Sequence, residues 1–312
     1  MKKLNQLRRY ATLSIILSFA LALAPYNETA FAMRSNNSFI RENPQWKILI
    51  LIYRSTNVTY TDSTGQQHHL IAQLEEPETM RLAAAATRFV VTDIPALTSG
   101  FMQPLLTIRY PDQPLSALTS TPCNDYSPSP VDTLSERDQS FDSVIALYDG
   151  SGVDALNNNQ MLSVVGCAYS WPMGTEPTYA AIPSDFIGPN LRNTNVFKHE
   201  WGHSILSFFA AAGTAPQPDV NNHINDTDVR YVNCLTGDPY VLVDEDDDNL
   251  IPNSIYNNLS GFTHDYYSGQ TATADQPTRC LGINQEAWRS GGPVTRPILI
   301  DDTRIYIPIV RR

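Results

Sequence analysis

The chain has 312 residues, of which 42% are hydrophobic and 17% charged, and 32 acidic residues outnumber 21 basic ones to give a formal net charge of −11. This excess of acidic residues argues against nucleic acid or an anionic membrane surface as a partner, because both carry negative charge themselves. The length is sufficient for one large domain, or for a domain with an additional lobe, and we expect a monomer.

The first 32 residues have the features of a secretory signal peptide. Two lysines and two arginines lie within the first nine residues, an apolar run follows at residues 11–24, and Ala30-Phe31-Ala32 has the small-x-small pattern of a cleavage site. An uncleaved membrane anchor is the alternative, but the run is short for a membrane span. We therefore predict a secreted protein with no membrane segment after cleavage, in which residues 33–45 form a loose leader.

The first third of the expected mature chain alternates between strand and helix patterns. Residues 46–53 (WKILILIY) are almost all apolar and rich in β-branched side chains, which predicts a strand buried on both faces. Polar residues 56–73 indicate a loop or a hairpin, and residues 75–91 have the acidic start and apolar face of a helix. Residues 105–110 are a second strand candidate, and the Pro-, Ser- and Asp-rich residues 111–140 predict a long irregular connection.

Three more strand candidates lead to a second helix. Residues 141–148 predict a third strand, and residues 164–171 and 178–182 predict two short ones. The helix is expected to begin at Asn193 or Thr194 and to run to about Ala212, before a glycine that ends it.

Beyond this helix the regular patterning fades. Residues 214–293 are rich in Asn, Asp, Pro, Gly, Ser and Tyr, which predicts a loop-rich lobe. Two strand-like runs follow at residues 298–300 and 305–310. We therefore divide the chain into an N-terminal subdomain, residues 46–213, and a C-terminal subdomain, residues 214–312.

The chain contains four cysteines. Because export places them in an oxidising compartment, two disulfides are expected. We favour the pairs Cys123–Cys167 and Cys234–Cys280, since each stays on one side of the second helix.

The most specific motif is His199-Glu200-Trp201-Gly202-His203, which has the pattern HExxH. Two histidines four residues apart on a helix lie on one face, so both can bind one zinc ion. Glu200 can take a proton from a water at that metal. Gly202 costs about 1 kcal/mol of helix propensity relative to alanine, and its lack of a side chain lets a substrate or another segment approach closely.

The motif and the order of elements before it resemble the N-terminal half of zincin metallopeptidases, over residues 46–212. The resemblance implies an α+β fold in which a twisted mixed sheet supports the active-site helix. It also implies that the short edge strand before the helix lines the substrate cleft, a place taken here by residues 166–169. The chain departs from the metzincin pattern HExxHxxGxxH, with Leu206 and Phe209 at the last two fixed positions, and no methionine follows Met173.

Catalytic zinc needs a third protein ligand, which must then come from beyond the helix. His223 is our first choice, because it is the first histidine after the helix and the loop before it is long enough to fold back. The alternatives are Asp265 or His264, in a stretch loosely similar to the aspzincin pattern GTxDxxYG, and Glu286, which would act as in gluzincins.

These residues predict a secreted zinc-dependent endopeptidase that acts on proteins or peptides, with Glu200 as general base. Tyr267 or Tyr266 is a candidate donor to the oxyanion, and packing is the alternative role for either ring. Two other functions stay open: a cation-binding or adhesive module with a non-catalytic HExxH, and a zinc hydrolase of non-peptide amides or esters.

A second cation site is suggested by the acidic run that begins at Asp244. Asp244, Asp246 and Asp248 have the 1, 3, 5 spacing of EF-hand-like loops, and Asn249 occupies the tight-turn position. Position 12 holds Ile255 instead of glutamate, so the EF-hand pattern is incomplete. We predict calcium binding here, and a plain acidic surface loop is the alternative.

Overall fold

The structure is a computed structural model of the whole chain. It describes residues 45–62, 64–119, 127–133, 135–136, 140–157, 159–160, 166–169, 176–187, 194–211, 231–239 and 262–294. The contacts divide the chain into Met1–Arg41 and Glu42–Arg312, and all described residues belong to the second unit. The predicted signal peptide, nearly all of the leader, the subdomain boundary at residue 213 and the C-terminal strands lie outside the described residues and stay predictions.

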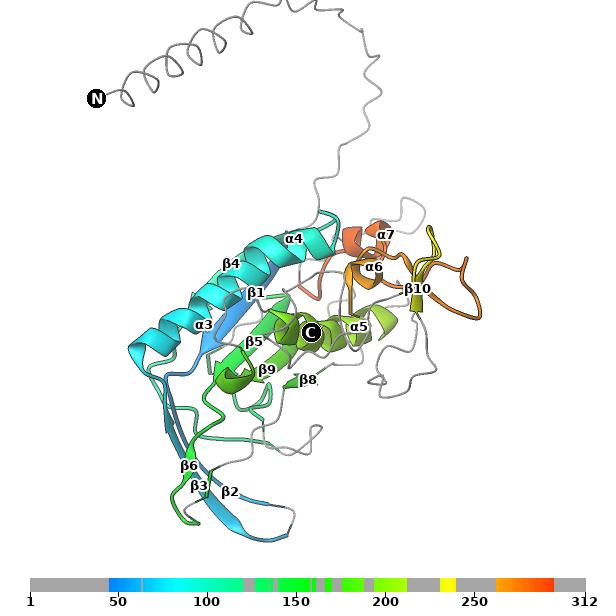
Figure 1. The fold of residues 1–312 in the computed structure, drawn as a ribbon. Helices are drawn as coiled ribbons and strands as arrows, with labels where there is room; N and C mark the ends of the chain where they lie inside the picture. Colours follow the sequence, from blue (N-terminus) through cyan, green and yellow to red (C-terminus); the bar gives the residue numbers. More distant parts are fainter. Residues whose placement is uncertain are drawn as a thin grey trace, which may run out of the picture. The chain divides into compact units, whose positions relative to one another are not determined.

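Five strands form the central sheet, in the spatial order β4-β1-β5-β9-β8 (Figure 1). They are β1 (Gln45–Ile52), β4 (Gln103–Arg109), β5 (Ser143–Tyr148), β8 (Cys167–Tyr169) and β9 (Thr178–Pro183). The strands β4, β1, β5 and β9 run parallel, whereas β8 at the edge runs antiparallel to β9. The fold is therefore α+β with a mixed sheet, as the sequence predicts.

The central strand β1 is buried on both faces, which confirms the interpretation of its apolar sequence. Ile48 and Ile50 are fully buried on the side of the sheet that the helices cover. Leu49 and Leu51 point to the opposite face, since alternate side chains of a strand do so, and they are fully buried in a second core.

The predicted helix at residues 75–91 is confirmed as α3 (Glu76–Arg88), and it continues through the π-helical turn η1 (Phe89–Asp93) into α4 (Ile94–Leu97). The wider turn comes directly before Pro95. Proline has no N–H to donate to the carbonyl four residues earlier, and its ring would crowd that carbonyl in a regular α-helix.

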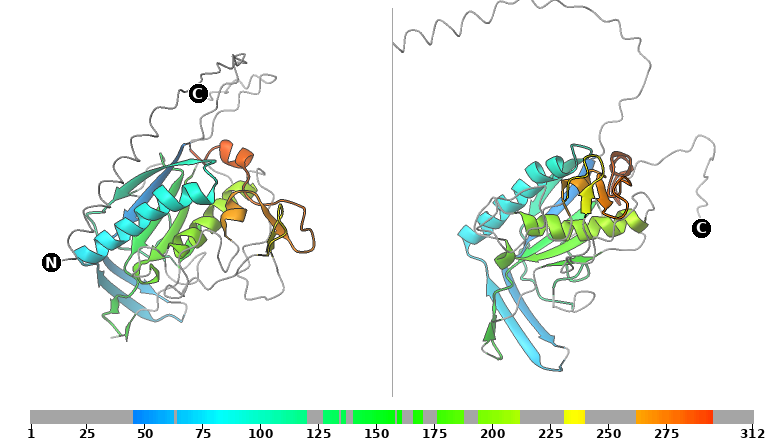
Figure 2. Two further views of the ribbon diagram at one scale, coloured as in Figure 1. Left: turned by 45° about the horizontal axis from the view of Figure 1, so that its top comes forward. Right: turned by 45° about the vertical axis from the view of Figure 1, so that its right-hand side comes forward.

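The second helix, α5 (Asn195–Ala211), lies beside α3 and η1 across the same face of the sheet (Figures 1 and 2). The rings of Phe89 and Phe197 stack between them, with centroids 5.3 Å apart. No helix in the described part of the chain is long and apolar enough to cross a membrane.

The helices and strands that the structure describes after α5 are short. They are β10 (Tyr231–Asn233), α6 (His264–Tyr267), β11 (Thr271–Thr273) and α7 (Gln285–Arg289). The strands β10 and β11 pair antiparallel.

A smaller antiparallel sheet has the order β2-β3-β6-β7 and extends from the lower end of the main sheet in Figure 1. Its strands are β2 (Ser55–Thr61), β3 (Gln67–Gln73), β6 (Val153–Asp154) and β7 (Asn159–Gln160). Residues 56–73, predicted as a loop or a hairpin, therefore form a hairpin. We call these four strands the β-arm.

His68 binds two carboxylates inside the β-arm. Its Nδ1 lies 2.7 Å from Asp154 Oδ2 and its Nε2 lies 3.0 Å from Asp62 Oδ2. Tyr60 stacks on the imidazole, with ring centroids 4.9 Å apart. Because ionised carboxylates only accept hydrogen bonds, the contacts of both ring nitrogens favour the imidazolium form of His68. The hydrogen bonds to Asp62 and Asp154 accordingly raise the pKa of His68.

This arrangement predicts that the β-arm is most stable below neutral pH. A raised pKa in the folded state adds stability that is fully present below the unfolded value, about 6.5 for histidine, and is lost as pH rises through the folded value. On the acid side, hydrogen bonds from Thr64 and His68 hold the pKa of Asp62 well below its usual range, so its contribution is lost only at strongly acid pH.

Amide exchange of β2 and β3, expressed as protection factors, should therefore fall between pH 5.5 and pH 8 in the wild type. The fall should be much smaller in His68→Gln. The matched control is His69→Gln, because His69 Nε2 contacts the neutral Asn57 side chain, 2.8 Å away. Equal pH dependence in the wild type and His68→Gln would contradict the prediction.

Candidate metal centre

The helix α5 carries the HExxH motif and is fixed at its beginning by contacts to the preceding helical segment. The Thr194 hydroxyl donates to Asp93 of η1, and both side chains are buried. The Lys198 amide donates to the Thr194 carbonyl, 3.1 Å away, in the first turn. Asn195 accepts from the buried Lys198 ammonium at 3.1 Å. These bonds anchor the motif helix one turn before the first histidine.

A single buried hydroxyl joins α5 to the sheet. Ser143 Oγ, at the start of β5, accepts from Trp46 Nε1 at 2.9 Å and from Trp201 Nε1 at 3.2 Å. It also lies 2.6 Å from Thr178 Oγ1. A hydroxyl has one proton and two acceptor positions, so Ser143 must donate to Thr178, which in turn donates to the Asp142 carbonyl at 3.2 Å.

Trp201 therefore faces the sheet, and the two histidines face away from it. His199 and His203 lie two positions on either side of Trp201, which is about 200° around a helix. Their Nε2 atoms are 2.9 Å apart, and Glu200 Oε1 lies 3.9 Å from His199 Nε2. His199 is 4% exposed and Glu200 is 5% exposed.

This donor set fits a zinc ion. Two imidazole nitrogens bound to tetrahedral zinc, each at about 2.1 Å, lie about 3.4 Å apart. The observed 2.9 Å between the Nε2 atoms of His199 and His203 needs only a small rotation of the rings to reach that separation. The nearby carboxylate of Glu200 is buried, so it is shielded from bulk water.

Two glycines allow other segments to approach the motif. A Cβ on Gly202 would lie 2.6 Å from ring atoms of Phe262 and 2.7 Å from Tyr267 Oη. The sequence predicts a close approach at Gly202, and the structure confirms it. A Cβ on Gly166 would lie 2.4 Å from Glu200 Oε1. Gly166 directly precedes β8, so the edge strand of the sheet begins against the general-base candidate.

The two residues that depart from the metzincin pattern belong to the core. Leu206 is 6% exposed and Phe209 is fully buried. The ring of Phe209 lies 5.9 Å from that of Trp46 and 5.1 Å from that of Trp288, centroid to centroid. The position of a third metzincin histidine is therefore used for packing.

No third candidate ligand is gathered with His199 and His203 among the described residues. His223, the first choice, lies outside them, and so do Asp244, Asp246 and Asp248 of the predicted calcium loop. Within the described ranges, no group of three or more His, Cys, Asp or Glu side chains could hold a metal ion.

The alternative ligands are not gathered at the histidine pair. His264 Nε2 lies 2.9 Å from Ser99 Oγ, and His264 Nδ1 lies 3.2 Å from Asp265 Oδ1. The first contact joins α6 to the turn after α4, and the second lies within α6. Glu286 is exposed on the first turn of α7. The structure thus gives no support to Asp265, His264 or Glu286 as the third ligand.

The contacts of Tyr267 favour packing over the predicted oxyanion role. Its side chain is fully buried, and its hydroxyl donates to the Lys198 carbonyl at 2.5 Å. Its ring stacks on Trp201, with centroids 5.4 Å apart. Tyr266 is fully buried as well. These contacts favour the packing role that the sequence left as the alternative for both rings, and the oxyanion role stays a prediction.

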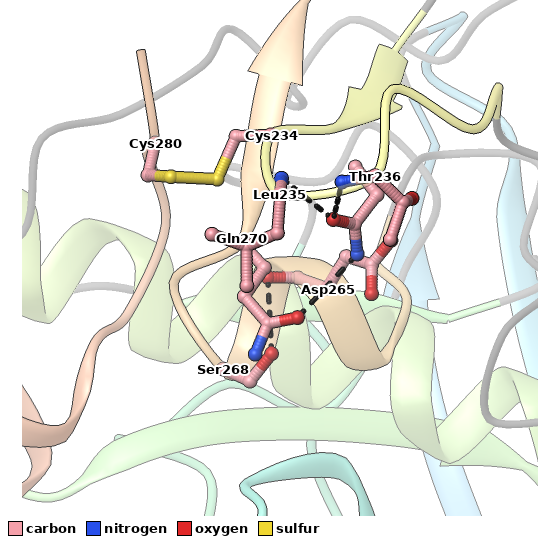
Figure 3. Close-up of a disulfide and its surroundings, with 8 residues drawn as sticks. Cys234, Leu235, Thr236, Asp265, Ser268, Gln270 and Cys280 are labelled. Atoms are coloured by element: carbon pink, nitrogen blue, oxygen red, sulfur yellow. Dashed lines mark hydrogen bonds between the residues drawn. A yellow bond between two sulfur atoms is a disulfide. The ribbon is translucent and has the colours of Figure 1, made fainter. Parts of the chain in front are cut away.

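The segment that contains these tyrosines is held by a disulfide. Cys234 and Cys280 are bonded, with their Cα atoms 5.3 Å apart, as predicted (Figure 3). The Cys234 amide donates to the Gln270 carbonyl at 2.8 Å, and the Gln270 amide donates to the Asp265 carbonyl at 2.6 Å. The disulfide is thereby linked to α6. Cys167 is also disulfide-bonded, and its predicted partner lies outside the described residues.

Sequence reasoning placed residues 166–169 at the cleft, but it missed two contacts with the motif, that of Phe262 with the histidines and that of Gly166 with Glu200. Neither residue type carries metal or acid–base chemistry, so motif analysis has no reason to select them. The signal that points to Phe262 is Gly202, because an unfavourable glycine inside a helix indicates that something else occupies the space of its side chain.

No protein-family model matches the chain, and no curated protein matches it. Among solved structures, archaemetzincin from Methanopyrus kandleri is similar at 17% sequence identity, with a TM-score of 0.30, over 56% of this chain and 78% of that one. A likeness this distant supports no argument about activity.

Because Trp46 and Trp201 both donate to the Ser143 hydroxyl, we predict that Ser143→Ala is strongly destabilising. The variant leaves two buried indole N–H groups without an acceptor, which should lower the free energy of unfolding by about 2–5 kcal/mol. Urea denaturation measures the loss. The control is Ser151→Ala on the surface, which should change stability by less than about 0.5 kcal/mol. Similar losses in the two variants would rule out the role assigned to Ser143.

Proposed function

We propose that the protein is a secreted zinc-dependent endopeptidase, with His199 and His203 as metal ligands and Glu200 as general base. The observation that supports this most directly is the convergence of the Nε2 atoms of buried His199 and partly exposed His203, 2.9 Å apart, beside the buried carboxylate of Glu200. Two histidines and a glutamate so arranged suit hydrolysis better than a structural role, because a structural zinc site closes all four positions with protein ligands.

Zinc bound there would supply a Lewis acid that polarises a carbonyl and makes a water more acidic. Glu200 takes the proton of the attacking water and returns it to the leaving amine. Its burial, with only 5% of the residue exposed, keeps bulk water away from that proton transfer. The close packing of Gly166 restricts the carboxylate to one side.

A third ligand is needed, and we propose His223. The core positions of Leu206 and Phe209 support this, because they exclude a ligand from the last turns of α5. The contact between His264 Nε2 and Ser99 Oγ also favours His223, because it occupies a ring nitrogen of the alternative ligand His264.

Peptides are the proposed substrates. In the described sheet, β8 is the last strand, and its start lies against Glu200. An extended peptide could therefore lie along β8 with its carbonyl near the histidine pair, since an edge strand can pair with another chain.

Secretion and calcium binding are part of the same proposal. The disulfide between Cys234 and Cys280 supports an oxidising compartment. Calcium at Asp244, Asp246 and Asp248 would stabilise a lobe that has few regular elements.

Casein cleavage by the purified protein tests the function. Glu200→Gln should retain zinc and lose about 10²–10⁴-fold in rate, because the general base is removed while both ligands stay. His203→Ala should lose both zinc and activity. A chelator should abolish cleavage, and added zinc should restore it.

The matched control is Glu286→Gln, since Glu286 is an exposed glutamate on α7 and should be indifferent to substitution. Full activity in Glu200→Gln, or cleavage that survives the chelator, would disprove the peptidase. Bound zinc without hydrolysis of casein, of other amides or of esters would favour the cation-binding module.

A further inference from the structure

Phe262 lies against both histidines of the motif. Its ring centroid is 5.9 Å from that of His199 and 4.9 Å from that of His203, with interplanar angles of 82° and 78°. The side chain of Phe262 is fully buried. One aromatic ring thus makes edge-to-face contacts with both candidate ligands, although it comes from a segment about 60 residues further along the chain.

The room for this ring is made by Gly202. An ideal Cβ at Gly202 would lie 2.6 Å from both Cγ and Cδ1 of Phe262. Contacts this short do not occur, so any other residue at this position would displace the ring. The helix therefore accepts the propensity cost of glycine directly beside His203, and Phe262 fills the space.

The ring of Phe262 also packs against two tyrosines of α6. Tyr266 lies edge-to-face with Phe262, with centroids 5.3 Å apart, and Tyr267 lies 6.4 Å away. The Tyr266 carbonyl accepts from the Ile283 amide at 2.9 Å. The Cys234–Cys280 disulfide holds the same segment through Gln270. Phe262 therefore has little freedom to move away from the histidines.

We propose that Phe262 is a positioning residue of the metal centre. Its ring limits rotation of both imidazoles, so that their Nε2 atoms converge before a metal ion is bound. The inference rests on the proposed function, because it assumes that His199 and His203 are zinc ligands. Ligands oriented in advance lose less freedom when the ion binds, which raises metal affinity without any direct contact between Phe262 and the ion.

The test compares Phe262→Ala and Phe262→Leu with the wild type. Zinc affinity is measured by competition with a chromophoric chelator, and ligand geometry by the visible absorption of the Co²⁺-substituted protein. We expect Phe262→Ala to bind zinc about 10–100-fold more weakly and to show an altered Co²⁺ spectrum. Phe262→Leu keeps most of the apolar volume, so it should fold and show a smaller change in the same direction.

The matched control is Phe197→Ala on the same helix. Phe197 is also fully buried, but it stacks on Phe89. This variant should lower the melting temperature of the metal-free protein and leave zinc affinity and the Co²⁺ spectrum unchanged.

Wild-type affinity and spectrum in both Phe262 variants would overturn the inference and leave the proposed function standing. Equal loss of affinity in Phe197→Ala would overturn it as well, because the effect would then follow general stability. A wild-type protein that binds neither Zn²⁺ nor Co²⁺ would contradict both the proposed function and the role of Phe262.

Discussion

The hydroxyl of Ser143 is the contact on which the candidate site depends. It accepts from the indoles of Trp46 on β1 and Trp201 on α5, so it joins the buried centre of the sheet to the middle of the motif helix. Once Trp201 is directed at the sheet, helix geometry turns His199 and His203 to the opposite side. The position of the catalytic candidates thus follows from a buried polar contact that carries no chemistry itself.

The opposite side of α5 is completed by a distant part of the chain. Phe262 contacts both histidines, and Tyr267 binds the Lys198 carbonyl one turn before the second histidine. The Cys234–Cys280 disulfide joins the residue after β10 to the segment after β11. The sheet therefore orients the helix, and the segment that contains Phe262 packs against the two histidines on it.

Much of the fold could be predicted from the sequence because its signals are local. Each segment's own order of apolar and polar residues shows which of its side chains are buried. This holds for the apolar run at residues 46–53 and for the helix pattern at residues 75–91. The HExxH motif is likewise local, because the spacing of its two histidines on a helix places both on one face. The hairpin at residues 56–73 stayed ambiguous, since its polar strands bury only part of one face.

Contacts between distant segments could not be predicted in the same way. The loosely matching motif predicts an oxyanion role for Tyr267, and it gives no sign that the hydroxyl donates to a carbonyl 69 residues away in the sequence. Phe262 gave no chemical signal at all. In the sequence, Ser143 is an ordinary strand residue. Its role depends on the positions of Trp46 and Trp201, whose indoles both donate to its hydroxyl in the folded structure.

The central claim is that the face of α5 opposite Trp201 is a zinc site built on His199 and His203. X-ray absorption at the zinc edge of the zinc-loaded protein tests it most directly. The spectrum should show a first shell of nitrogen and oxygen at about 2.0–2.1 Å, with the multiple-scattering pattern of at least two imidazoles that loses one imidazole in His203→Ala. A first shell containing sulfur at about 2.3 Å, or a spectrum unchanged by His203→Ala, would place the metal elsewhere and contradict the account.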